Sequence, residues 1–186
     1  MSNREALRKL SRKFPAPPEI DRIMDDLRGE KDISVAIVAS AIAEASLEKL
    51  ITNKFKTKRS ALIGQIFKSG GPLDDFHAFH IITSNMAEEL HSIKTIRNTF
   101  AHAKIPISFD HELVAHEISS LKMLTAIRSV EKETERKLEL SNKAWFLLIT
   151  KIILIMFDEL GAHAGTPDEA IKDALDSDAR ERSASL

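Results

Sequence analysis

The sequence predicts an all-α protein folded as a single helical bundle of about six to eight helices. The chain has 186 residues, which is the length of one domain. Apolar residues recur at helical spacing along most of it. Six glycines, six prolines, one tryptophan and no tyrosine are fewer turn and aromatic residues than a β-sandwich or barrel needs. We expect a helical domain over residues 1–160 and an acidic, partly disordered tail over residues 161–186.

Capping and breaking residues divide the first half of the chain. We expect helices here over residues 4–13, 18–28, 33–53, 60–68 and 74–82. Proline is poorly tolerated inside a helix, so Pro15–Pro18 ends the first one, and Gly29 stops the second. Asp32 caps the third helix, whose apolar residues cover more than one face, as in a central helix packed on two sides. Ser69–Pro72 is the clearest loop.

The second half is divided in the same way. We expect helices over residues 85–105, 110–139 and 142–160, and a short one in the tail over 166–175. Asn85 and Glu88 have the spacing of a capping box, and Pro106 ends the helix that they begin. Asp110 caps the long helix that follows, which runs into a solvated charged stretch over residues 131–139.

Ser141 caps the most apolar helix, over residues 142–160, and Gly161 stops it. Large apolar side chains gain roughly 1.5–3 kcal/mol each on burial, so we expect this helix in the core or at a dimer contact. Its apolar run, residues 144–157, is shorter than the roughly 20 residues that cross a bilayer, and Lys151 interrupts it. We expect no membrane association, and a cytoplasmic protein.

Composition also excludes several kinds of site. The chain has no cysteine, which removes disulfides and thiolate metal sites, and we expect neither a metal nor a cofactor. His77 and His80 have a metal-compatible spacing, but we interpret them as solvent-side or capping residues. A net charge of −1 argues against a broadly basic nucleic-acid surface. Basic residues gather at 4–13 and 54–59, where a solvated surface is the simpler interpretation.

The most informative segment is Ile93–His102, with the sequence IKTIRNTFAH. On a helix, Ile93, Ile96 and Phe100 turn inward, and three versatile polar residues lie close together. Arg97 carries a permanent charge and five donors suited to carboxylate or phosphate. Asn98 donates and accepts hydrogen bonds, and His102 titrates near neutral pH. We expect Arg97, Asn98 and His102 to form one connected polar binding site beside the core, with Phe100 buried beneath it.

Two interpretations of this site stay open. In the structural one, Arg97 pairs with a carboxylate, with Glu44, Glu48 and Asp32 as candidates, and Asn98 and His102 cap helix ends. In the enzymatic one, the three polar residues are catalytic. Arg97 and His102 lie roughly 140° apart on a regular helix. They converge only if the helix ends between them or the arginine side chain reaches around.

The segment Arg97–His102 resembles the RNxFAH signature of the mannitol operon repressor family. Further similarity lies in Leu27–Asp32, Leu47–Leu50, Gly71–Leu73 with Phe76, and Phe109–Asp110, so that the similar region covers about residues 20–125. The resemblance implies an all-helical, transcriptional-repressor-like regulator. Such a protein would be non-enzymatic, would lack a recognisable DNA-binding helix-turn-helix, and would act through a protein partner.

Arg97–His102 is also similar to the R-x4-H motif of HEPN domains, some of which are metal-independent ribonucleases. That resemblance implies a homodimer whose two motifs share one cleft. His102 would handle a 2′-hydroxyl or leaving-group proton, Arg97 would stabilise charge on the phosphate, and Asn98 would orient one of them. A near-neutral surface favours the regulator, with the ribonuclease as the alternative.

Overall fold

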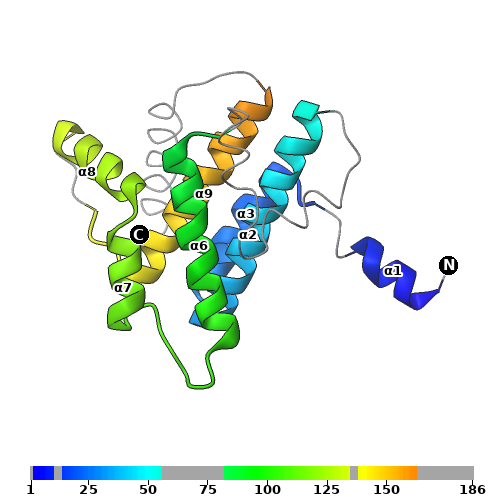
Figure 1. The fold of residues 1–186 in the computed structure, drawn as a ribbon, viewed down its shortest axis with the longest axis horizontal. Helices are drawn as coiled ribbons and strands as arrows, with labels where there is room; N and C mark the ends of the chain where they lie inside the picture. The colour runs from blue at the N-terminus through cyan, green and yellow to red at the C-terminus, as the bar shows by residue number, and fades with distance from the viewer. Residues whose placement is uncertain (1, 11–13, 56–81, 135–137, 163–186) are drawn as a thin grey trace.

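The computed structural model describes residues 2–10, 14–55, 82–134 and 138–162, and it confirms the all-α bundle (Figure 1). These residues form seven helices and no strand. The helices are α1 (Asn3–Leu10), α2 (Pro17–Arg28), α3 (Asp32–Phe55), α6 (Ser84–His102), α7 (Glu112–Ser119), α8 (Lys122–Thr134) and α9 (Asn142–Ala162). Four predicted features lie outside the described residues: the helices over 60–68 and 166–175, the loop Ser69–Pro72, and almost all of the helix over 74–82.

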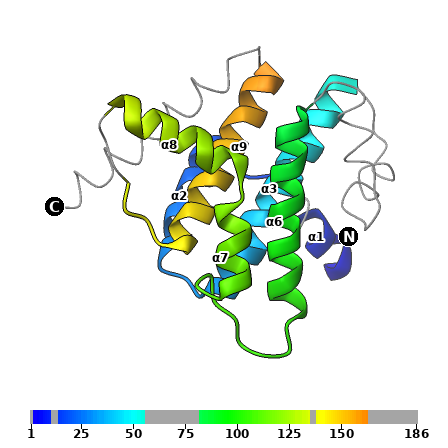
Figure 2. The same cartoon turned by 60° about the vertical axis from the view of Figure 1, so that its left-hand side comes forward.

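Helices α3 and α9 form the centre of the bundle, and α6 packs against α3 on another side (Figures 1 and 2). Helix α2 contacts both central helices, while α7 and α8 connect α6 with α9. This arrangement confirms that the alanine-rich α3 is packed on more than one side. The exposed residues in the first half of this helix are apolar.

Three phenylalanines join the helices at the core. Phe100 of α6 packs against Phe109, with ring centroids 4.9 Å apart and the planes tilted. Phe109 packs in turn against Phe146 of α9, at 5.1 Å. All three rings are buried. Phe100 therefore lies beneath the motif surface, as the sequence predicts.

Helix α9 confirms the prediction of a buried apolar helix. Residues 145–154 are buried without a break, and so is Phe157. The backbone N–H of Ala144 donates to Ser141 Oγ at 3.3 Å, which confirms Ser141 as the cap. The predicted end at residue 160 is two residues too early, since the helix runs through Gly161 to Ala162.

Helix α6 begins and ends differently from the prediction. Its N-cap is Thr83, whose hydroxyl accepts a hydrogen bond from Met86 N–H at 3.2 Å, rather than Asn85. The Asn85 side chain is engaged elsewhere, because its oxygen accepts from the Lys122 ammonium at 3.2 Å. The helix ends at His102, where Ala103 turns to extended backbone, four residues before Pro106.

The predicted single helix over residues 110–139 is two helices, α7 and α8, separated at Ser120 and Leu121. His111 caps α7 by accepting from Leu113 N–H at 3.3 Å, and the Asp110 carboxylate instead accepts from Asn142. Helix α8 starts anew because the Glu89 carboxylate of α6 caps it by accepting a hydrogen bond from Met123 N–H. A cap supplied from a distant helix leaves no signal in the local sequence.

Candidate functional site

Arg97 is held by an ion pair between α6 and α3. Its Nη2 lies 2.7 Å from Glu44 Oε1, and the two side chains are 26% and 24% exposed. Arg97 Nε and Glu44 Oε1 are both buried atoms without an aligned hydrogen bond. Of the three carboxylates proposed for Arg97, the structure selects Glu44. The guanidinium charge is therefore compensated inside the fold.

Burial dominates the electrostatics of this pair. Desolvation raises the pKa of Glu44 above its ordinary value of 4.5, although Arg97 and then Lys94 act in the opposite direction. Lys94 lies on α6 one turn before Arg97, on the side that faces α3. Glu44 thus faces two cations, and the cost of removing its charge from water still exceeds their attraction.

Asn98 and His102 lie on a different side of α6. They are four residues apart, so they share one ridge of the helix, where Asn98 is half-buried and His102 is exposed. Helix α6 stays regular through His102, so Arg97 and His102 leave the axis about 140° apart. Within the described part of the chain, no hydrogen bond or ion pair joins Arg97 to either of the other two. The prediction of one connected polar site is therefore wrong, because the regular helix holds Arg97 on another side.

No protein-family model, curated protein or solved structure matches this chain.

An exposed apolar strip runs along α3 beside the ion pair. We call it the α3 face, and its members are Ile33, Ile37, Val38 and Ala41. Ile37 and Val38 are each 38% exposed, unusual for large apolar side chains in the middle of a helix. Glu44 follows Ile37 by seven residues, which is two turns along the same side of the helix. The Arg97–Glu44 pair thus borders the α3 face.

Asp32 and Glu48, the other two carboxylates proposed for Arg97, lie elsewhere. Glu48 is exposed on α3. Asp32 accepts a hydrogen bond from Phe109 N–H at 3.0 Å and pairs with the Lys143 ammonium at 3.4 Å. The predicted helix cap is thus a long-range tie: it fixes the first turn of α3 to the segment before α7 and to the start of α9.

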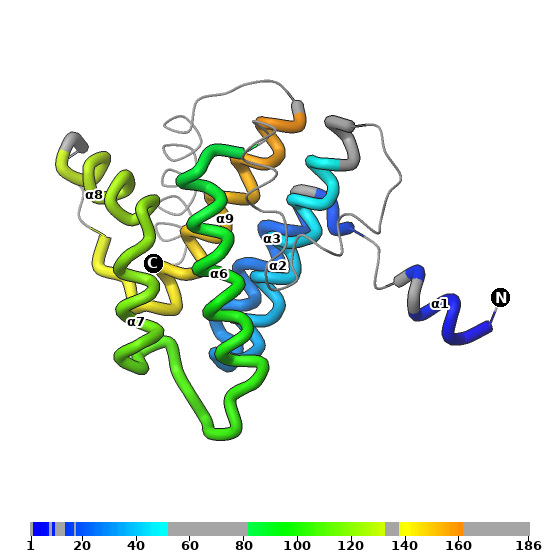
Figure 3. Tube along the Cα trace, in the orientation of Figure 1, coloured from blue at the N-terminus to red at the C-terminus, as the bar shows by residue number. Residues whose placement is uncertain are grey.

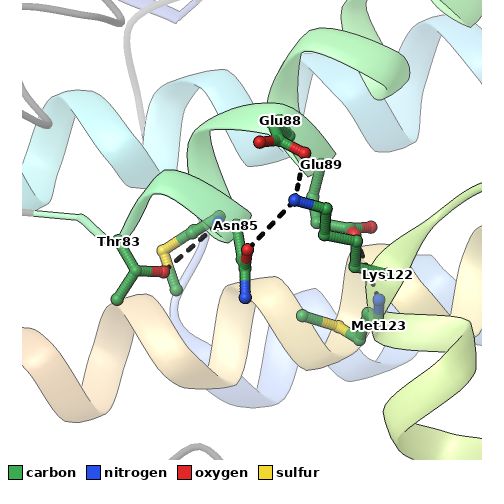
Figure 4. A network of polar contacts seen from close by, with 7 residues as sticks. Thr83, Asn85, Glu88, Glu89, Lys122 and Met123 are labelled. Carbon is green, nitrogen blue, oxygen red and sulfur yellow. Dashed lines mark hydrogen bonds and ion pairs between the residues drawn. The ribbon is translucent and has the colours of Figure 1, made fainter.

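Glu89 is a buried group that the sequence analysis missed (Figure 4). It lies on the core side of α6, and its Oε1 accepts the backbone N–H of Met123 at 3.0 Å, capping α8. Its Oε2 is buried without a hydrogen bond, and desolvation raises the pKa of this carboxyl above 4.5. A signal was available, because Glu89 falls at helical spacing between Met86 and Ile93, among apolar residues.

Metal ligands do not cluster in the part of the chain that the structure describes, where no group of three or more His, Asp or Glu residues is placed to hold an ion. His77 and His80 lie outside the described residues, as does most of the basic cluster at 54–59. Among the described helices, none is both long enough and apolar enough to cross a membrane.

Proposed function

We propose that this protein is a non-enzymatic regulator that acts through a macromolecular partner, as the resemblance to the mannitol operon repressor family implies. The observation that carries the proposal is the state of Arg97. Its guanidinium is paired with Glu44 at 2.7 Å and three-quarters buried, so its charge already serves the fold. An arginine that stabilises a phosphate in a transition state needs donors aimed at that phosphate.

The α3 face supports a partner-binding role. Ile33, Ile37 and Val38 are exposed in one strip, and adjacent exposed apolar residues are typical of interaction surfaces. The Arg97–Glu44 pair and Lys94 supply a polar border along the α6 side. An apolar centre with a charged rim is the usual organisation of a protein–protein interface.

The alternative function is a HEPN-type metal-independent ribonuclease. One observation favours it: Asn98 and His102 share an outer ridge of α6, and His102 is exposed to solvent. Such an enzyme would require Arg97 to exchange Glu44 for a phosphate. Cleavage of RNA by the purified protein would show this ribonuclease activity directly.

The proposal is tested by replacing Ile37 with glutamate on the α3 face. Immobilised wild-type protein, Ile37→Glu and the control Leu113→Glu are compared for the proteins that each retains from extracts of the source cells. Leu113 is 73% exposed on α7 and is outside the α3 face, so its variant controls for added surface charge. A retained protein is then purified and its affinity for each variant is measured by calorimetry.

We expect wild type and Leu113→Glu to bind the purified partner alike, and Ile37→Glu to bind at least tenfold more weakly. Equal binding by all three proteins would contradict a role for the α3 face. Tight, sequence-specific binding of the isolated protein to duplex DNA would contradict the proposal as a whole, since it would make the protein a direct DNA binder.

A further inference from the structure

A cavity of about 330 Å³ opens at the end of the bundle where α3 and α9 finish and α2 begins. Its apolar wall includes Ile20, Leu50, Leu154 and Phe157. Water occupies about 30 Å³ in the liquid, so the cavity has room for one or two large apolar side chains. It lies at the opposite end of α3 from the α3 face and is therefore a separate feature.

The rim of this cavity carries more negative than positive charge. Asp21, Asp158 and Glu159 line it and are exposed. Its two lysines already face carboxylates: Lys151 Nζ lies 3.4 Å from Asp21, and Lys49 Nζ lies 3.9 Å from Asp158. The side chain of Lys151 is almost fully buried, so the outer rim presents three carboxylates and one ammonium. Such a rim attracts a cationic segment.

Helix α1 has the matching chemistry. It carries Arg4, Arg8 and Lys9 against one acid, Glu5, and its Leu7 is 57% exposed. The helix caps itself, because Ser2 N–H donates to the Glu5 carboxylate at 2.8 Å while Ser2 Oγ accepts from Glu5 N–H at 3.3 Å. This reciprocal capping favours the helix without help from the bundle.

Helix α1 is linked to the cavity of its own chain through Phe14. Phe14, four residues after the helix, lines the cavity of its own chain and lies under the Lys49 ammonium, 4.9 Å from Nζ to the ring centroid. From there α1 lies at one edge of the molecule, apart from the other helices (Figures 1 and 3). Leu7, Arg4 and Lys9 are all exposed on this helix, so another molecule can contact them.

We propose that two copies of this chain exchange their α1 helices. Leu7 of each copy enters the cavity of the other, and the basic residues of α1 lie against the carboxylates of its rim. The exchange is reciprocal, so the dimer has two-fold symmetry, and each cavity is complete only when the partner copy is present. This inference does not depend on the α3 face.

Thiol crosslinking tests the exchange directly, because the chain has no cysteine of its own. Leu7→Cys protein is mixed with Glu159→Cys protein and oxidised mildly, and Leu7→Cys mixed with Leu113→Cys is the control. We expect a mixed disulfide dimer at least tenfold more abundant in the first mixture. Equal yields in the two mixtures would overturn the exchange.

Two further measurements complete the test. Light scattering after gel filtration should give a dimer for wild type and for Leu113→Asp, and a monomer for Leu7→Asp with unchanged helix content. The double variant Leu7→Cys/Glu159→Cys should form disulfides between chains at concentrations where the wild type is dimeric. A monomeric wild type at 100 μM or more, or a disulfide formed only within one chain, would show that α1 does not reach a second copy and would overturn the proposal.

Discussion

At the scale of single residues, the Arg97–Glu44 pair links α6 to α3, and removing Arg97 would leave the Glu44 carboxylate partly buried without its partner. Breaking a fully buried pair by removing one partner costs about 3–5 kcal/mol, whereas an exposed pair contributes less than about 1 kcal/mol. Both side chains are about a quarter exposed, so the cost of removing Arg97 lies between these limits. We expect Arg97→Ala to lower the free energy of unfolding by about 2 kcal/mol, measured by urea denaturation.

The control for this substitution is Lys104→Ala, which removes an exposed cation just beyond α6. It should change the free energy of unfolding by less than about 0.5 kcal/mol. If Arg97→Ala were as stable as Lys104→Ala, the pair would not hold the two helices together, and the structural interpretation of Arg97 would be wrong.

Glu89 makes stability depend on pH. Burial raises the pKa of this carboxyl above 4.5, so the folded protein holds the proton more tightly than the unfolded chain. The stability that this group contributes is complete below pH 4.5 and is lost as the pH rises through the raised pKa. The Glu89→Gln side chain keeps an oxygen that can accept the Met123 N–H. We expect its urea midpoint, relative to that of wild type, to increase from pH 4 to pH 7.

The matched control is Glu88→Gln, on the same turn of α6. The Glu88 carboxylate is exposed and lies 2.5 Å from the Lys122 ammonium. Figure 4 shows the two side chains and their contact. The difference in urea midpoint between Glu88→Gln and wild type should stay constant over this pH range or decrease as the pH rises, because the neutral side chain loses the ion pair. A constant difference between Glu89→Gln and wild type across this pH range would contradict the raised pKa.

At the scale of the helices, Thr83 decides where α6 begins. A threonine cap replaced by alanine costs about 1 kcal/mol. Thr83→Ala should therefore lower the free energy of unfolding by about that amount in thermal or urea denaturation, while Ser84→Ala should be nearly neutral. A larger loss of stability in Ser84→Ala than in Thr83→Ala would place the cap at Ser84 and contradict the hydrogen bond from Met86 N–H.

Helix α9 should be the most sensitive element to truncation of a core side chain. Phe146 is fully buried and contacts the Phe109 ring, and phenylalanine-to-alanine changes in cores cost about 3–5 kcal/mol. We expect Phe146→Ala to lose stability in that range by calorimetry, or to fail to fold. Leu113→Ala, at an exposed position, should be within about 0.5 kcal/mol of wild type.

The sequence predicted those elements whose signals are local. The apolar length of α9, its Ser141 cap and the broad apolar surface of α3 can all be recognised in the chain itself. The start of α6 was missed because Thr83 and Asn85 are both good caps, and Lys122 from another helix engages Asn85. The break between α7 and α8 was missed because its cap, Glu89, is more than thirty residues away.

The candidate site was predictable in part for the same reason. The motif gave Arg97, Asn98, His102 and the buried Phe100, and helical geometry gave the angle between Arg97 and His102. The choice among three carboxylates for Arg97 required the register of α3 against α6, which no local pattern contains. Glu44 is selected because it comes level with Arg97 when the helices pack.

At the scale of the whole molecule, the Arg97–Glu44 pair, the α3 face and the cavity lie at different places along α3. The Arg97–Glu44 pair joins two central helices and borders the α3 face, which we propose as the partner surface. The cavity at the other end of α3 is the site proposed for α1 exchange. Because the motif arginine is engaged in an ion pair of the fold, we propose that these two surfaces serve assembly with other molecules.

We propose that Arg97, Asn98 and His102 do not cleave RNA. This proposal is tested most directly by incubating purified wild type and His102→Ala with labelled single-stranded RNA in EDTA, alongside melting curves of both proteins. We expect no cleavage above a buffer control by either protein. The melting temperatures should agree within about 2 °C, because His102 is exposed. EDTA-resistant cleavage by wild type that disappears in an equally stable His102→Ala protein would contradict the account.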